Sequence, residues 1–326
     1  MTCLRRTFLA GMAAFGLSLS GQAHAQAANY PSKPIRIIYT FAPGGTGDVI
    51  ARTLANSLTE MLGQSVVVEN RTGASGTIGT LAAARAPGDG YTLLLTTITT
   101  VVQTPLVTRD SSFDPVGSLV PIANLAMTPL VLVTSNRVPA HDFPSFADWV
   151  KKQPQAVNVA VAGPTLEVAT AVLARDANLR FQNINYRGQA PALQAVLAGD
   201  VDVFFCPPST AMNEFIREGR IKVIGVTSAQ PSPAMPQATP ISRYVPNYVQ
   251  DINFALWTSP GTPPAIVSQL SEAVTRALSG KGMAEKFVGF GVPLAVAPGS
   301  EVTRITRREH DNIHNILKTV QINFGG

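Results

Sequence analysis

Short apolar runs alternate with amphipathic segments along this chain from residue 35 onward. The apolar runs are rich in β-branched residues and bounded by Gly, Pro or Asn, which is typical of buried strands. The segments between them carry apolar residues at helical spacing. We predict strands at 35–39, 66–69 and 92–96 and helices at 47–62 and 77–85. This βαβαβ order predicts a parallel sheet covered by helices.

The same alternation restarts at Pro129, which indicates a second α/β lobe. Two of its helices are followed by Gly199 and Gly219, and glycine is favoured at helix C-termini. The predicted strands are 130–134, 157–161, 183–186, 201–205 and 222–227, and the predicted helices are 146–152, 167–176, 190–198 and 209–218.

The remaining C-terminal pattern is too short for a further domain. Residues 229–250 are rich in Pro, Ser and Gln and predict an irregular excursion. A strand at 254–258 and helices at 263–278 and 300–318 follow. We expect them to return to the first lobe. The prediction is therefore lobe 1 from 26–128 and 253–326, lobe 2 from 129–252, and a hinge made of two chain crossings.

The first 25 residues resemble a secretory signal peptide. Arg5 and Arg6 precede an apolar run at 8–19, and Ala23-His24-Ala25 is a small-x-small cleavage site. The run is too short for a permanent membrane span. The twin arginine also fits a Tat-type signal, so the route of export stays open. We predict cleavage after Ala25 and a location in the periplasm.

Composition excludes several other classes of protein. Loss of Arg5 and Arg6, with no acidic residue, lowers the formal charge from +5 to +3, and no Lys/Arg run points to nucleic acid. Cys206 is the single cysteine after the signal, so no disulfide or Cys-based redox site is expected. His310 and His314 are spaced i, i+4, but polar neighbours favour a solvated helix face over a metal site. We expect no metal and no cofactor.

A glycine-rich turn joins the first strand to the first helix and is the main candidate for a binding site. Such a turn exposes backbone N–H groups at the positive end of a helix dipole, where anions bind. The spacing lacks the third glycine of a dinucleotide fingerprint. Asp48 has two interpretations, as a helix cap or as a ligand contact. The candidate residues here are Phe41, Gly44, Gly45, Thr46, Gly47 and Asp48.

Other candidates lie where further predicted strands end, since ligands of α/β sheets bind at the carboxyl ends of strands. The threonines there serve either as caps or as ligand donors, and Arg187 either as an ion-pair partner or as a ligand contact. Cys206 follows a buried strand and is most simply interpreted as a small core thiol. These candidates are Ser75, Gly76, Thr96, Thr97, Gly163, Thr165, Arg187, Gly188 and Cys206.

Several collinear motifs resemble the Bug family, the extracytoplasmic solute receptors of tripartite tricarboxylate transporters. Pro43-Gly44-Gly45-Thr46-Gly47-Asp48 matches the family's Pro-Gly-Gly-x-x-Asp motif. The segments 30–36, 67–79, 89–93, 186–193, 232–236 and 260–263 follow in the family's order. The matches cover nearly the whole chain after the signal.

The resemblance implies a type II periplasmic-binding-protein fold with the ligand cleft between two hinged lobes. It also implies a non-enzymatic receptor that closes on a small carboxylate, held in part by the turn at 43–48. The implied partners are that solute and a membrane permease of the tripartite tricarboxylate type, with the receptor a monomer.

Two departures from the family pattern fall in the second lobe. Glu167 stands where the family usually has a histidine, after a shorter loop, and Cys206-Pro207 replaces an Asp-Asn pair. A less acidic, amphoteric or bulkier carboxylate is therefore as plausible as a tricarboxylate. Two other functions stay open: a ligand sensor for a two-component system, and an exported α/β enzyme. The shortage of histidines and the absence of hydrolase motifs argue against the enzyme.

Overall fold

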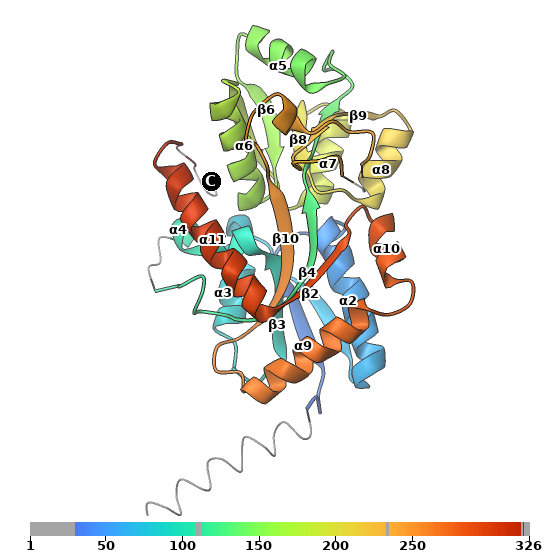
Figure 1. The fold of residues 1–326 in the computed structure, drawn as a ribbon, viewed down its shortest axis with the longest axis vertical. Helices are drawn as coiled ribbons and strands as arrows, with labels where there is room; N and C mark the ends of the chain where they lie inside the picture. The colour runs from blue at the N-terminus through green and yellow to red at the C-terminus, as the bar shows by residue number, and fades with distance from the viewer. Residues whose placement is uncertain (1–29, 109–111, 233–234, 321, 323–326) are drawn as a thin grey trace, which may run out of the picture.

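The computed structural model describes residues 30–108, 112–232, 235–320 and 322 and folds them into two α/β lobes. The lobes lie one above the other in Figure 1, each around its own sheet. The predicted signal peptide and its cleavage site lie outside the described residues. No described helix is both long enough and apolar enough to cross a membrane.

The lower lobe in Figure 1 contains a sheet with the strand order β11-β4-β10-β3-β1-β2. Its strands are β1 (Ile35–Tyr39), β2 (Val66–Asn70), β3 (Thr92–Thr97), β4 (Val120–Pro129), β10 (Asp251–Thr258) and β11 (Leu294–Pro298). Its helices are α2 (Thr46–Leu62), α3 (Thr77–Ala84), α4 (Ile98–Thr108), α9 (Pro264–Leu278), α10 (Met283–Gly289) and α11 (Gly299–Leu317), with a 3₁₀ turn η1 (Ala74–Gly76) before α3.

The prediction of a parallel sheet holds for only part of this lobe. β1 pairs in parallel with β2 and β3, as expected from the βαβαβ pattern. β10, however, runs antiparallel to β3 and β4, and β11 runs antiparallel to β4, so the sheet is mixed. The C-terminal strand and helices do return to this lobe, and β10 supplies its central antiparallel strand.

Four elements, β4, β11, α4 and α10, were not predicted from the sequence. β4 begins and ends near prolines, Pro121 and Pro129, and is otherwise rich in small residues. α4 is rich in Thr and Val and contains Pro105, which is unfavourable inside a helix. Local propensity is therefore weak in both elements. Packing against neighbouring elements stabilises them instead.

The upper lobe contains a sheet with the order β7-β6-β8-β5-β9 and helices on its faces. Among its described residues, the segment between β9 and β10 contains only a short 3₁₀ turn, η2 (Ile241–Arg243), and two isolated bridges, consistent with the irregular excursion predicted there. The strands are β5 (Val131–Ser135), β6 (Val157–Val161), β7 (Phe181–Asn185), β8 (Val203–Cys206) and β9 (Ile221–Val226), and the helices are α5 (Phe143–Lys152), α6 (Pro164–Asp176), α7 (Gln189–Ala198) and α8 (Thr210–Arg217).

Both lobes share one strand arrangement, which creates the cleft. In each, a parallel set (β2-β1-β3 or β7-β6-β8) is followed by an antiparallel strand, β10 or β5, through which the chain crosses between the lobes. The carboxyl ends of the two parallel sets therefore face each other across the gap between the lobes. Ligand sites of α/β sheets form at such ends.

The two crossings are tied together at Thr227. Leu130, between β4 and β5, donates its N–H to the Thr227 hydroxyl oxygen (2.8 Å) and accepts from the Thr227 N–H (2.9 Å). Gln250, just before β10, donates its N–H to the Thr227 carbonyl (3.0 Å). One buried residue thus holds both interlobe segments in register.

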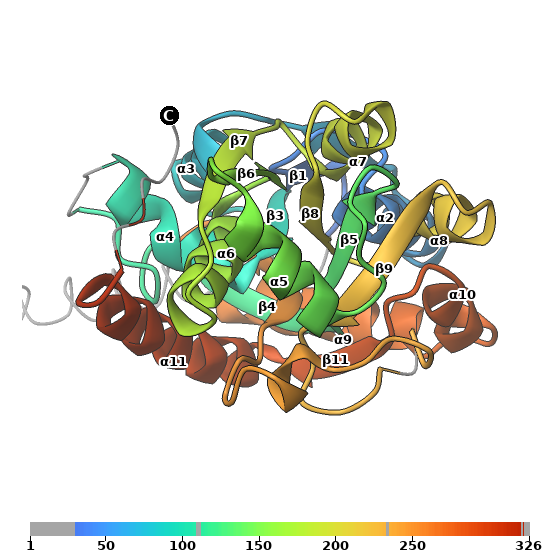
Figure 2. The same ribbon diagram turned by 90° about the horizontal axis from the view of Figure 1, so that it is seen from above.

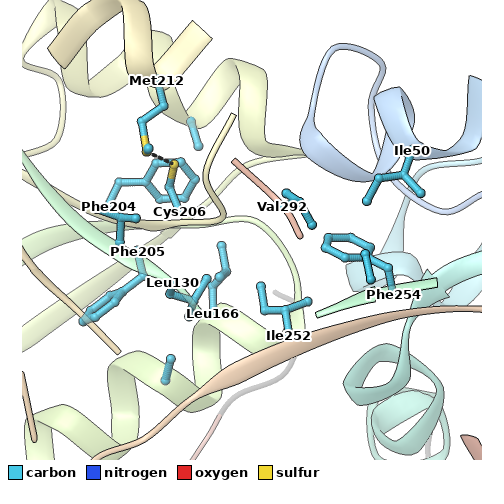
Figure 3. Close-up of a cluster of buried hydrophobic side chains, with 14 of the residues drawn as sticks. Ile50, Leu130, Leu166, Phe204, Phe205, Cys206, Met212, Ile252, Phe254 and Val292 are labelled. Atoms are coloured by element: carbon cyan, nitrogen blue, oxygen red, sulfur yellow. Dashed lines mark hydrogen bonds between the residues drawn. The ribbon is translucent and has the colours of Figure 1, made fainter. Parts of the chain in front are cut away.

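Buried apolar side chains continue from one lobe into the other without a break. Figure 3 follows this cluster from Ile50 on α2, past Phe254 and Leu130, to Phe205 on β8. At the edge of the molecule, α10 lies beside α8 of the other lobe in Figures 1 and 2. The two lobes are in contact in this structure, and the cleft between them is closed.

Candidate functional site

The cleft is lined by the turns that follow the parallel strands of each lobe. Ala42, after β1, donates its N–H to the Arg187 carbonyl after β7 at 3.1 Å. The hydroxyl oxygens of Thr97 and Thr165 lie 3.1 Å apart, one from each lobe. These contacts bring together turns that are far apart in the sequence.

Asp48 serves as the internal anchor of the first glycine turn. It is buried and accepts from the Gly44 N–H (3.1 Å), from Asn70 Nδ2 (2.9 Å) and from both Nε and Nη2 of Arg52 (3.0 and 3.1 Å). Burial raises its pKa, but the hydrogen bonds from Arg52, Asn70 and Gly44 outweigh burial, so the pKa is lowered overall. Four donors saturate a carboxylate, which favours the structural interpretation of Asp48.

Thr46, at the start of α2, meets a side chain of the opposite lobe. Its N–H donates to Gln189 Oε1 at 2.9 Å, and its hydroxyl lies within hydrogen-bond distance of the same oxygen (2.8 Å) and of the Pro208 carbonyl (2.7 Å). In this closed form, the Thr46 N–H of the glycine turn therefore donates to the side-chain amide of Gln189.

A small inner cavity of about 40 Å³ lies beside this contact. That volume holds roughly one water molecule. Most of its walls are apolar, and they come from both lobes and from the crossing strand β10. The lining residues are Tyr39, Phe41, Thr46, Gly47, Thr97, Ala162, Thr165, Leu166, Gln189, Pro207, Ile252 and Phe254.

A larger outer cavity of about 360 Å³ shares Phe41 as a wall with the inner one. Gly163, at φ +104°, packs so closely on Phe41 that a Cβ there would lie 2.6 Å from the ring. A non-glycine residue would therefore be both strained and crowded at this position. The outer cavity is lined by Phe41, Gly73, Ala74, Ser75, Gly76, Gly163, Asn185, Tyr186 and Arg187.

The second glycine turn gives the outer cavity an unusual backbone wall. Residues 73–76 all have positive φ, including the non-glycine residues Ala74 (+43°) and Ser75 (+52°), a strained arrangement that is concentrated at functional sites. Among the described residues, the N–H groups of Ala74 and Ser75 meet no acceptor. The Ser75 hydroxyl lies 3.4 Å from Glu167 Oε1 across the cleft.

Arg187 adds a positive charge to the same cavity. Its side chain is exposed and forms no ion pair within the described part of the chain. Arg71, by contrast, is paired with Glu69. The turn with its unpaired backbone donors and the Arg187 side chain both line this cavity, a combination that suits a carboxylate.

A family model described as "Tripartite tricarboxylate transporter family receptor" matches residues 50–322. The chain belongs to this family of solute receptors.

Three similar proteins agree with this assignment. Protein BugT of Bordetella pertussis is 33% identical over 276 residues, covering 82% of this chain and 83% of BugT. The solved periplasmic binding protein BugD is 27% identical with a TM-score of 0.82, covering 89% of this chain and 98% of BugD. The structure of R. palustris Rpa4515 with adipate is 26% identical with a TM-score of 0.83, with coverage of 89% and 98%. The two-lobed periplasmic-binding-protein fold expected from the sequence is confirmed.

Most predicted site residues of this receptor line one of the two cavities, but several do not. Asp48 lies inside its turn, Thr96 is buried with its hydroxyl 2.7 Å from that of Thr40, and Gly188 packs against Ala42. Gly44 lies against Ala190 and Gly45 against Gln189, both of lobe 2, and neither glycine lines a cavity. Cys206 is fully buried behind Gln189, and burial raises the pKa of its thiol to about 12.

Several lining residues of this receptor were not predicted, including Gln189, Pro207, Ile252 and Phe254. Gln189 and Pro207 follow strand ends in lobe 2, so their position was a usable signal. Ile252 and Phe254 come from the crossing strand β10, which nothing in the local sequence places in the cleft. In the described residues, no cluster of His, Cys, Asp or Glu is arranged to hold a metal.

Proposed function

We propose that this chain is a periplasmic receptor that closes its two lobes on a carboxylate-bearing solute and delivers the solute to a tripartite tricarboxylate-type permease. The carboxylate would bind in the outer cavity, against the turn at 73–76 and the Arg187 guanidinium. The observation that carries the proposal is that Arg187, which forms no ion pair with a described residue, lines the same cavity as the turn at 73–76. The adipate in the related Rpa4515 structure supports a carboxylate ligand.

The lobes would act as a clamp. Lobe 1 would comprise 26–128 and 253–326, and lobe 2 would comprise 129–252, with motion about the crossings tied at Thr227. Closure assembles a cavity with walls from both lobes, so a solute that contacts both shifts the equilibrium toward the closed state. A monomer suffices, because one chain supplies every wall of the cavity.

The test is a calorimetric and thermal-shift screen of carboxylates, with two arginine variants. A solute that binds only the folded protein raises the free energy of unfolding by about 2.7 kcal/mol at 100 times Kd, and the unfolding midpoint rises with it. Arg187→Ala should weaken binding at least tenfold. Arg217→Ala removes an exposed arginine of α8 in the same lobe and should change nothing. If no carboxylate raises the midpoint, the proposed function is wrong.

Export is tested separately. Cleavage after Ala25 predicts that the protein recovered from the periplasm begins at Gln26, as read by intact mass or N-terminal sequencing. Recovery of the uncleaved chain from the cytoplasm would contradict the proposed location.

A further inference from the structure

Gln189 reaches out of lobe 2 and places its carboxamide oxygen at the N-terminus of α2 in lobe 1. There it lies 2.9 Å from the Thr46 nitrogen and 2.8 Å from the Thr46 hydroxyl. Gln189 Oε1 thus occupies a position that suits an oxygen of a bound carboxylate.

The other end of the same carboxamide is fixed by lobe 2. Gln189 Nε2 donates to the Pro207 carbonyl at 2.6 Å and lies 3.4 Å from Cys206 Sγ. Cys206 in turn lies 3.3 Å from Met212 Sδ in the buried cluster of Figure 3. These bonds fix the orientation of the carboxamide, and its oxygen points at Thr46 of lobe 1.

We propose that Gln189 is a latch that substitutes for one carboxylate of the solute. This proposal rests on the proposed function, because it concerns the same cleft. The neutral oxygen of Gln189 accepts from the Thr46 donors at the start of α2, where a carboxylate of the solute would otherwise bind. The solute then needs a carboxylate only at its other end, in the outer cavity.

The inner cavity lies beside the latch and shares Phe41 as a wall with the outer cavity, so we assign it to the second end of the solute. It is small and mostly apolar, with Phe41, Phe254 and Leu166 among its walls. A charged group placed there would be desolvated beside a turn whose Thr46 donors are already used. A solute with one carboxylate and an apolar end therefore fits better than a dicarboxylate of the same length.

The experiment compares hexanoate with adipate, two probes matched in carbon number, by titration calorimetry on wild type, Gln189→Ala and Gln194→Ala. Gln194 lies on the same helix α7 and is exposed, and its side chain makes no hydrogen bond to a described residue, so Gln194→Ala is the matched control. Small-angle scattering of each protein without solute reports how closed the lobes are.

Wild type should bind hexanoate at least tenfold more tightly than adipate. Gln189→Ala should increase the radius of gyration without solute and reduce the hexanoate preference at least fivefold, because the Thr46 donors become available to the second carboxylate. Gln194→Ala should match wild type in both readouts. Gln189→Met, which keeps the side-chain length without an acceptor, should behave as Gln189→Ala does.

Two results would overturn the latch. One is a wild type that prefers adipate; the other is a Gln189→Ala protein with unchanged scattering and unchanged preference. If both probes bind and Gln189→Ala has no effect, the latch is wrong while the carboxylate receptor stands. If no carboxylate binds to any variant but Gln189→Ala still opens the lobes, the receptor proposal and the solute preference fail and the closing contact stands.

Discussion

Asp48 is the acceptor around which the first glycine turn is built. Its carboxylate joins the turn at Gly44 to α2 through Arg52 and to β2 through Asn70. A motif residue beside a binding turn can therefore act on the site indirectly, by holding the turn in shape. The chemistry of the cleft then depends on backbone groups that this residue positions.

Asp48→Asn should destabilise the protein by about 1–3 kcal/mol at pH 7, because an amide cannot accept all four hydrogen bonds. The folded-state pKa of Asp48 is lowered, so its contribution is present above the unfolded pKa of about 3.9 and is lost as pH falls through the folded pKa. Urea unfolding at pH 7 and pH 3 should show the difference from wild type shrinking at pH 3. An equal loss at both pH values would contradict this role.

Gly45 is a position where a side chain should block closure without straining the backbone. Its φ of −86° suits any residue, but an added Cβ would lie 3.3 Å from Gln189 Cβ of the other lobe. Gly45→Val should weaken carboxylate binding at least tenfold, about 1.4 kcal/mol, with little change in unfolding midpoint. Gly289→Val, where the space is open, is the control. Retained affinity in Gly45→Val would show that the lobes close differently.

At the scale of elements, the two crossings between the sheets depend on one buried threonine. Thr227 gives Leu130 both a hydroxyl acceptor and a donor, while its carbonyl accepts from Gln250. The register of β4–β5 against β9–β10 is set at this point. The two crossings that form the hinge are therefore held in a fixed position relative to each other.

Thr227→Val should lower the free energy of unfolding by about 1–3 kcal/mol, because the buried Leu130 N–H loses its acceptor. Thr134→Val is a matched control: Thr134 is equally buried on β5, and its hydroxyl has no hydrogen-bond partner among the described residues. That variant should be neutral or slightly stabilising. Urea denaturation of both proteins distinguishes a hydrogen-bond loss from a general cost of the substitution.

Elements with a strong local pattern were predictable, and elements stabilised by their surroundings were not. The strand at 35–39 and the helix ending at Leu62 were predicted closely because their apolar positions repeat with the right period. β4 lacks such a pattern, yet it is the strand through which the chain enters lobe 2. Pairing with β10 and β11 supplies what its sequence lacks.

At the scale of the whole molecule, the end of the chain returns to lobe 2. α11 packs on lobe 1, but Thr319 accepts a hydrogen bond from Arg175 Nη1 on α6 at 2.8 Å. Val320 and Ile322 line a cavity of about 570 Å³ together with α6 and β7. This is an interlobe contact remote from the two crossings.

Removal of residues 319–326 should therefore shift the lobes toward the open state and weaken solute binding severalfold, since affinity falls with the population of the closed form. Removal of 323–326 alone keeps Thr319, Val320 and Ile322 and serves as the control. Scattering and calorimetry on both truncations measure the effect. If the longer truncation is as closed as wild type, this contact does not contribute to closure.

The sequence by itself determined the two α/β lobes, the family and the glycine turns, because period, turn chemistry and motif order are local properties. It also located some of the cavity-lining residues, among them Thr46, Thr97 and Arg187, since strand ends gather at one edge of a sheet. Only the tertiary structure decided which donors are already used. Asn70 of β2 donates to the Asp48 carboxylate, the Gln189 oxygen accepts from Thr46 across the cleft, and β10 brings Ile252 and Phe254 into the wall. These are contacts between segments distant in the chain, and no local pattern encodes them.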